Sequence, residues 1–251
     1  AQESRGLGDV YKRQPVQQLA QLLCIPDYTV YFVTQEKIMQ YKYIFFDLDG
    51  TLTDSGIGIT NSVMYALDKF GIHADRENLY CFIGPPLVDS FMEFYGFPED
   101  KARKAVEYYR EYFSVTGLFE NKVYDGMEDV LDKLKSAGHK LYVATSKPKV
   151  YADRILERFD LKKYFEYVAG ADLEGHKSSK SDVVKEAMEI SHASYDKILM
   201  IGDRKHDIIG ARDNGIRTAA VLYGYGNRKE FEEECADSVS YTHLRAHETP
   251  E

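Results

Sequence analysis

The sequence lacks the features that mark three large classes of protein. No apolar run is long enough to span a membrane, and no basic-then-apolar segment opens the chain as a signal sequence would. Acidic residues outnumber basic ones, and the resulting net charge of −9 argues against broad nucleic-acid binding. Cys24, Cys81 and Cys235 show neither metal-binding spacing nor the even number of a disulfide framework. We therefore expect a cytoplasmic protein with reduced thiols that binds neither nucleic acid nor membrane.

What the sequence does contain is an alternation of short apolar runs and amphipathic segments. Apolar residues make up 44% of the 251 residues, enough for the core of one large domain or two small ones. Strands separated by helices form parallel sheets with right-handed crossovers. After residue 125, strands are predicted at 140–144, 167–170, 197–201 and 218–222, with helices between them. The predicted fold class is therefore α/β, with a Rossmann-like doubly wound parallel sheet as its core.

The chain is organised around an apolar run that ends at Phe46 and is followed by Asp47-Leu48-Asp49-Gly50-Thr51. The run is short and bounded by turn residues, as expected of a buried strand. Parallel α/β sheets place ligand chemistry at the carboxyl ends of their strands. Two carboxylates there repel each other unless a cation or a phosphoryl group lies between them. The structural alternative is a plain Asp-Gly turn.

The segment after this strand is helical. Helices are predicted at residues 60–70, 76–82, 86–95 and 99–115, and no convincing strand precedes Val123. We therefore predict a helical insert at 55–122 within a core formed by 39–54 and 123–238. Residues 1–38 and 239–251 fit this pattern poorly and are predicted to be non-native or disordered, with Met39 as the natural start. For the first of these segments, a genuine N-terminal extension is the alternative.

Polar residues recur near the ends of the later predicted strands. Thr145 and Ser146 follow the strand at 140–144, although a hydroxyl there can simply bond to the backbone. Asp203 and Asp207 follow the strand at 197–201, and such acids bind Mg²⁺, although Asp207 could also be a helix N-cap. The predicted basic residue of this site is Lys180, because it directly precedes a predicted helix. Its neighbour Lys177 is the rival, and an exposed, solvated side chain is the alternative for either lysine.

The Asp-x-Asp-Gly-Thr pattern at 47–51, with these later positions in the same order, resembles the motifs of the haloacid dehalogenase superfamily. The resemblance covers about residues 39–238 and implies that the insert is an α-helical cap domain. Within the superfamily, residues 54–59 and 82–87 are similar to phosphoglycolate phosphatases and bacterial 5'-nucleotidases. The resemblance thus implies a magnesium-dependent phosphomonoester hydrolase for a small phosphorylated metabolite, acting as a monomer or homodimer.

The resemblance also implies a role for each acidic residue. Asp47 would attack phosphorus and form an aspartyl-phosphate, which divides one difficult displacement into two easier ones. Asp49 would protonate the leaving alkoxide and then take a proton from the attacking water. The Mg²⁺ ligands would be the Asp47 carboxylate, the Asp49 backbone carbonyl and Asp203. Asp207 would act through a metal-bound water or orient Lys180.

The remaining predicted residues bind the phosphoryl group. By resemblance the Thr145 hydroxyl holds a phosphoryl oxygen, and Ser146 is the neighbouring candidate. Lys180 would neutralise phosphoryl charge and keep Asp47 ionised. In the superfamily this lysine commonly precedes proline, whereas Ser181 follows it here, so the choice between Lys180 and Lys177 stays open. The predicted phosphate-binding set is completed by Gly50 and Thr51.

The substrate and two rival functions remain open at this stage. The sequence does not choose between phosphoglycolate and a nucleoside 5'-monophosphate. A sugar-phosphate mutase of the same superfamily would have a histidine shortly after the first motif, and residues 56–59 contain none. A phosphoacceptor signalling or binding module, phosphorylated on Asp47 by a partner kinase, would explain the acid pair. It would not explain Asp49 as an acid/base or the helical insert.

Overall fold

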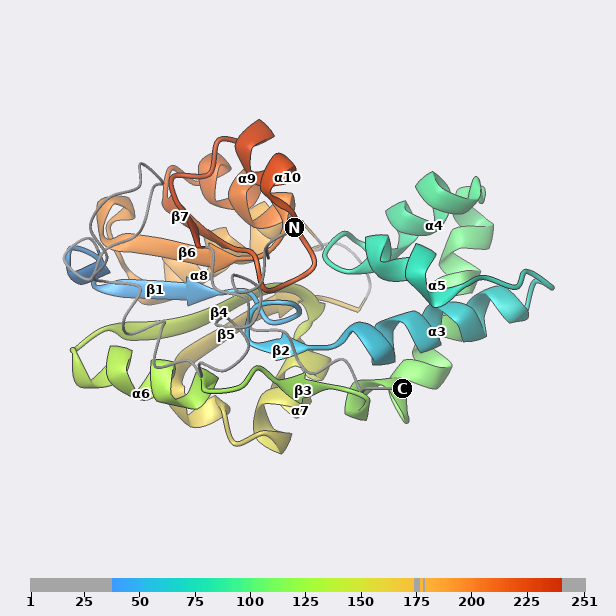
Figure 1. Ribbon diagram of the computed structural model, residues 1–251, viewed down its shortest axis with the longest axis horizontal. Helices are drawn as coiled ribbons and strands as arrows, with labels where there is room; N and C mark the ends of the chain where they lie inside the picture. The colour runs from blue at the N-terminus through green and yellow to red at the C-terminus, as the bar shows by residue number, and fades with distance from the viewer. Residues whose placement is uncertain (1–37, 174–176, 178, 241–251) are drawn as a thin grey trace, which may run out of the picture.

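The computed structural model describes residues 38–173, 177 and 179–240, and its centre is a six-stranded sheet (Figure 1). All neighbouring strands of this sheet run parallel, in the order β5-β4-β1-β6-β7-β8. The strands are β1 (Tyr43–Phe46), β4 (Lys140–Pro148), β5 (Phe165–Ala171), β6 (Ile198–Gly202), β7 (Arg217–Val221) and β8 (Val239–Ser240). The sequence order reverses across β1, so the chain winds outward from β1 in both directions.

Helices cover both faces of the sheet because its strands are apolar on both sides. Along β1, Ile44 and Phe46 belong to one buried cluster and Phe45 to another. The helices α6 (Met127–Ser136) and α7 (Lys149–Arg158) lie on one face, and α8 (Lys180–Ser191) and α9 (Lys205–Asp213) lie on the other (Figure 1). This arrangement confirms the predicted α/β fold class with a doubly wound, Rossmann-like core.

A second group of helices lies between β1 and β4 in the sequence and to one side of the sheet (Figure 1). The group contains α3 (Gly56–Asp68), the 3₁₀ helix η1 (Arg76–Phe82), α4 (Leu87–Tyr95), α5 (Glu99–Phe113) and the 3₁₀ helix η2 (Gly117–Phe119). A short antiparallel pair, β2 (Thr53–Asp54) and β3 (Lys122–Val123), joins this group to the core. We call these helices the cap.

Local sequence explains where the cap helices begin and end. Pro98 precedes α5, where a missing backbone N–H costs nothing, and Glu99 and Asp100 stand in the first turn, where the helix dipole favours acids. Gly96 ends α4 in the left-handed conformation with a φ of 63°, which glycine adopts without strain. The remaining elements are η3 (Lys162–Tyr164), η4 (Tyr195–Lys197) and α10 (Arg228–Glu233).

The structure differs from the sequence-based expectations at several boundaries. The strand predicted to end at residue 144 continues to Pro148, and α3 begins four residues earlier than predicted. Val239 and Ser240, assigned to the tail, pair with Ala220 and Val221 as the edge strand β8, so the sheet extends beyond the predicted boundary at residue 238. The rest of both terminal segments lies outside the described residues. Within the described ranges, no helix is long and apolar enough to cross a membrane.

Candidate active site

The candidate site lies where the carboxyl ends of β1, β4 and β6 meet. Phe46, the last residue of β1, pairs with Val143 in β4 and Ile201 in β6. The N–H of Asp47 then donates to the Ile201 carbonyl oxygen at 2.9 Å, which holds the first motif against β6. Because parallel strands end together at one edge, residues about 100 and 155 positions later in the sequence surround Asp47.

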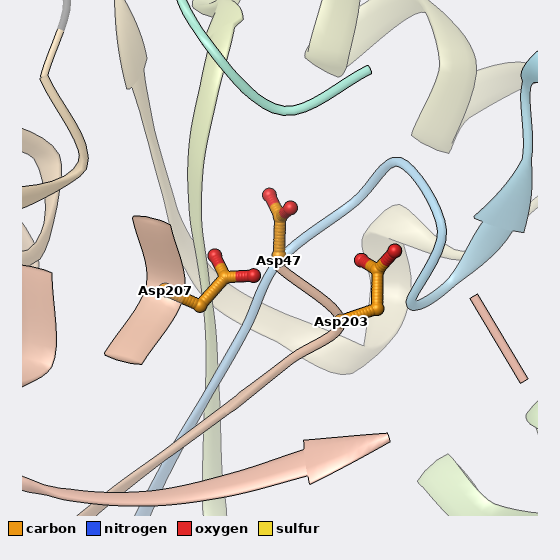
Figure 2. Close-up of side chains that lie close together, drawn as sticks. All are labelled: Asp47, Asp203 and Asp207. Atoms are coloured by element: carbon orange, nitrogen blue, oxygen red, sulfur yellow. The ribbon is translucent and has the colours of Figure 1, made fainter. Parts of the chain in front are cut away.

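Three carboxylates form an acid cluster at this edge. Each of Asp47, Asp203 and Asp207 has a carboxylate oxygen within 4.8 Å of the others, and all three side chains are buried. Asp47 stands between the other two, with Asp203 on the loop after β6 and Asp207 on α9 (Figure 2). Buried carboxylates this close repel one another unless cations compensate them.

One of the compensating cations is Lys180, at the start of α8. Its Nζ lies 2.7 Å from Asp47 Oδ1 and 2.8 Å from Asp207 Oδ1, and it donates to the Ala144 carbonyl oxygen at 3.1 Å. The Lys177 ammonium instead pairs with Glu186. The structure thus brings Lys180, and not Lys177, onto the predicted nucleophile.

The pKa values of the cluster reflect burial and mutual charge. Burial, and then the negative charges of Asp207 and Asp47, raise the pKa of the Asp203 carboxyl well above its usual value. Burial raises the pKa of Asp207 to about 6, against the opposing attraction of Lys180. Burial would lower the pKa of Lys180, but Asp207 and Asp47 outweigh it and raise the pKa, so the ammonium stays charged. The cluster therefore favours bound positive charge.

Gly50 and Thr51 lie against Asp203. The sequence predicts instead that they bind phosphate. The Thr51 hydroxyl donates to Asp203 Oδ1 at 3.0 Å and is fully buried, and the Gly50 N–H donates to the Thr53 carbonyl oxygen. Gly50 has a φ of +84°, and a Cβ there would lie 2.1 Å from Asp203 Oδ2. Neither residue lines the cavity above Asp47. Their predicted phosphate contact stays a prediction, and the structure shows both residues against Asp203.

Asp207 has partners on both carboxylate oxygens. Besides the Lys180 contact on Oδ1, its Oδ2 accepts from the Arg204 backbone N–H at 2.9 Å. Asp207 is the third residue of α9, and it completes a capping box with Arg204, so it is not itself the N-cap. These contacts fit a residue that orients Lys180.

Thr145 and Ser146 line the cavity, and the residue after them is one that sequence reasoning missed. Lys147 is buried, and its Nζ lies 2.9 Å from Asp49 Oδ2 and 4.4 Å from the centre of the Phe113 ring in the cap. Its backbone N–H donates to the Thr145 hydroxyl at 3.2 Å. The register of β4 against β5 is irregular between Thr145 and Pro148, and such irregularities re-aim side chains near active sites. A lysine directly after a polar strand end was the available signal.

Asp49 is placed to exchange a proton with a ligand in the cavity. Its Oδ2 is paired with Lys147, whereas its Oδ1 is buried and has no hydrogen-bond partner within the described part of the chain. Asp49 also lines the same cavity as Asp47. The second acid of the motif thus has one oxygen held by the protein and one available to a bound ligand.

A cavity of about 430 Å³ lies between the acid cluster and the cap. Its core side includes Asp47, Asp49, Thr145 and Lys147. Its cap side is mainly apolar and is lined by Phe82, Pro85, Pro86, Leu87, Val88, Met92, Val106, Tyr109 and Phe113, with Asp89, Glu99, Arg103 and Arg110 among them. The arrangement brings reactive carboxylates to the floor of a pocket large enough for a small metabolite.

The acid cluster has the donor chemistry of a site for a hard divalent cation. The cluster holds three buried carboxyl groups, and the Lys180 ammonium contacts two of them, Asp47 and Asp207. Mg²⁺ takes oxygen ligands and is commonly bound through one or two carboxylates. Asp47 and Asp203 meet this requirement.

Comparison with known proteins identifies relatives over most of the chain. A family model described as haloacid dehalogenase-like hydrolase matches residues 44–221. A 5'-nucleotidase of Pseudomonas aeruginosa is 45% identical over 197 residues, which cover 78% of this chain and 89% of that protein. Tyrosine-protein kinase PtkA of Mycobacterium tuberculosis is 39% identical over 199 residues, which cover 79% of this chain and 67% of that protein.

A solved structure agrees with the fold. The crystal structure of a protein from Clostridium acetobutylicum, described as a predicted phosphatase, matches with a TM-score of 0.78 and 50% sequence identity. The match covers 79% of this chain and 93% of that one.

Proposed function

The chain belongs to the haloacid dehalogenase-like hydrolase family and is a phosphatase, and we propose that it hydrolyses nucleoside 5'-monophosphates through an aspartyl-phosphate with Mg²⁺ as cofactor. The observation that carries this proposal is the buried contact of Lys180 with both Asp47 and Asp207 at the floor of a cavity that Asp49 also lines. This geometry supports the roles of Asp47 as nucleophile, of Lys180 as the cation beside it and of Asp49 as a separate proton carrier.

In the proposed reaction, Asp47 attacks the phosphorus atom and forms an acyl phosphate, and the bond to the leaving oxygen breaks. Asp49 gives its proton to that oxygen, through the carboxylate oxygen that has no protein partner. In the second half, Asp49 takes a proton from water, the water oxygen bonds to phosphorus, and the Asp47 carboxylate is released with inorganic phosphate. Lys180 lies beside Asp47 and would attract the phosphoryl oxygens, and Thr145 lines the same cavity.

The proposed cofactor would be held by Asp47 and Asp203, with the Asp49 backbone carbonyl as a further ligand. When bound, Mg²⁺ would supply positive charge next to the phosphoryl oxygens, where phosphoryl transfer develops its negative charge. Asp207 contacts Lys180 through Oδ1, and its Oδ2 accepts from the Arg204 backbone N–H. We assign Asp207 to the orientation of Lys180.

The cavity favours a nucleoside over the two-carbon acid of phosphoglycolate. Each of its three cationic side chains already has an oxygen partner: Lys147 pairs with Asp49, Arg103 with Glu99, and Arg110 donates to the Leu173 carbonyl oxygen. The carboxylate of phosphoglycolate would have to compete with Asp49 for Lys147 or with Glu99 for Arg103. The apolar and aromatic cap side instead offers surfaces on which a base can stack. The name of the relative from Pseudomonas aeruginosa supports the same choice.

The test is phosphate release from a panel of esters by the full chain, with Mg²⁺ and with a chelator. The panel contains nucleoside 5'-monophosphates, phosphoglycolate, sugar phosphates, pyrophosphate and phenyl phosphate. We expect release that requires Mg²⁺ and has its highest kcat/KM on a nucleoside 5'-monophosphate. A maximum on phosphoglycolate would overturn the substrate and keep the phosphatase. Isomerisation of a sugar phosphate without release, or a stable phosphoprotein, would instead favour the mutase or the phosphoacceptor function.

A further inference from the structure

One segment of the cap, residues 80–86, touches both the cavity and the loops that carry the acid cluster. It runs from Tyr80 near the end of η1 to Pro86, which precedes α4. Phe82, Gly84 and Pro86 line the cavity. The position of this segment therefore determines the shape of the wall that faces a substrate's leaving group.

The first core contact of this cap segment comes from Arg204, the residue directly after Asp203. One terminal nitrogen of its guanidinium donates to the Ile83 carbonyl oxygen. Its Nε donates to Glu230 Oε1 at 3.1 Å, and both of these side chains are largely buried. Gly84 has a φ of +109°, and a Cβ there would lie 3.0 Å from Arg204 Cγ, so only a glycine fits comfortably against this arginine. Glu230 thus fixes Arg204, and Arg204 fixes the cap segment.

The second core contact comes from Tyr225. Its backbone N–H donates to Asp203 Oδ2 at 2.8 Å, and its ring stacks on Tyr80 with centroids 5.9 Å apart and planes at 22°. The Tyr225 hydroxyl donates to Asp54 Oδ1 at 2.5 Å, and Asp54 ends the strand β2 that leads into the cap. One tyrosine therefore contacts the acid cluster, the start of the cap and the cap segment.

We propose that Arg204 and Tyr225 are positioning residues that hold residues 80–86 over the cavity and thereby set how tightly the substrate's leaving group is bound. The inference rests on the proposed function for its kinetic form, but the contacts themselves do not depend on it. Without these contacts, binding would have to order the cavity wall as well as the substrate, which costs affinity. Neither residue needs to touch the phosphoryl group for this role.

Two variants and two matched controls test the proposal in the full chain. Arg204→Met removes the guanidinium, and Tyr80→Ala removes the stacked ring. Arg212→Met is the first control, because Arg212 lies on α9, the helix that Arg204 precedes, and it pairs with Glu234 and donates to the Glu234 backbone carbonyl. Among the described residues it makes no hydrogen bond or ion pair with the cap. Tyr80→Phe is the second control, because it keeps the ring. Arg204→Lys should partly restore the contact with the Ile83 carbonyl oxygen.

The expected signature is a change in KM that depends on the size of the leaving group. For adenosine 5'-monophosphate, Arg204→Met should raise KM about tenfold and Tyr80→Ala about fivefold. For methyl phosphate, whose leaving group does not reach the cap, KM should change by less than about twofold. The Kd for Mg²⁺, measured by calorimetry without substrate, should stay within the same limit. Both controls should behave as the wild type.

Equal losses on both substrates, or a weaker Mg²⁺ affinity, would place the effect in the acid cluster and overturn the proposal. Unchanged KM values in both variants would also overturn it. Hydrogen exchange of the amides in residues 80–84 provides a readout without turnover. They should exchange faster in Arg204→Met and Tyr80→Ala than in the controls. Unchanged exchange would refute the positioning role even if the wild type hydrolysed no phosphomonoester, so the two proposals can fail separately.

Discussion

The two sides of the cavity are built from different chemistry. On the core side, buried charged groups hold one another, as in the contacts of Lys180 with Asp47 and Asp207 and of Lys147 with Asp49. On the cap side, the lining is mostly apolar, and an arginine such as Arg103 is paired within its own helix. A cluster of buried charges needs fixed partners, whereas an apolar wall can be changed at little electrostatic cost.

This difference separates two tasks. Every phosphate ester presents the same phosphoryl group to the core side, so a change there should affect all substrates alike. Leaving groups differ between esters, and in the proposed reaction they would face the cap side, so a change there should affect some substrates more than others.

The largest effect is expected for Asp47→Asn. The amide cannot serve as the nucleophile, so turnover should fall by about 10⁴-fold or more on every substrate. Mg²⁺ affinity should weaken only in part, because Asp203 remains. Steady-state phosphate release and calorimetry measure the two effects. Asp125→Asn, at an exposed position before α6, is the control. Retained turnover in Asp47→Asn would refute its role.

The next largest effect is expected for Lys180→Met. Removal of the ammonium leaves Asp47 and Asp207 buried beside each other, so kcat should fall by about 10²- to 10³-fold and the free energy of unfolding by about 3 kcal/mol. Lys177→Met, three residues earlier, should change kcat by less than about twofold. Activity assays and urea titrations of both variants test this prediction. A greater loss of kcat in Lys177→Met would assign the role beside Asp47 to Lys177 instead.

A smaller effect is expected for Lys147→Met, at the boundary between the two sides. The variant removes the partner of Asp49 Oδ2 but leaves the Lys180 contacts in place. We expect kcat/KM to fall about tenfold to a hundredfold on a nucleotide and on methyl phosphate alike. A loss of kcat/KM confined to the nucleotide would instead assign Lys147 to the cap side of the cavity.

The smallest effect is expected for Met92→Ala on the cap side. Met92 and Phe94 are both 41% exposed on α4, but only Met92 lines the cavity. Met92→Ala should raise KM for adenosine 5'-monophosphate about threefold and leave methyl phosphate unchanged, whereas Phe94→Ala should change neither. Michaelis–Menten kinetics on both esters provide the check. Equal KM shifts in the two variants would mean that these residues affect substrate binding through the folding of the cap and not through direct contact with the substrate.

Much of the fold could be read from the sequence because its signals are local. The apolar run before Asp47, the helical spacing of the cap and the glycines that end helices each depend on neighbouring residues. Boundaries were less accurate. The short strands β2 and β8 were not predicted, because two residues carry no periodic signal and their strands form only through pairing with a partner.

The site was predictable to the extent that each residue directly follows a strand or opens a helix. Asp47 and Asp203 stand at such positions, and Thr145 follows the strand as it was predicted, although β4 continues past it. The structure brings these residues and Asp49 to one edge of the sheet. The phosphate contact of Gly50 and Thr51 stays a prediction, and their spacing indicated proximity to the site but not that both lie against Asp203.

The sequence by itself determined the order of strands and helices, the acids at the strand ends and the resemblance to a phosphatase family. Only the tertiary structure decided that Lys180 and not Lys177 meets Asp47, that Lys147 pairs with Asp49, and that Arg204 and Tyr225 join the acid cluster to the cap. The physical reason is distance along the chain. Local spacing selects helix or strand, whereas the partner of a buried charge is selected by groups that are far apart in the sequence and meet only when the sheet assembles.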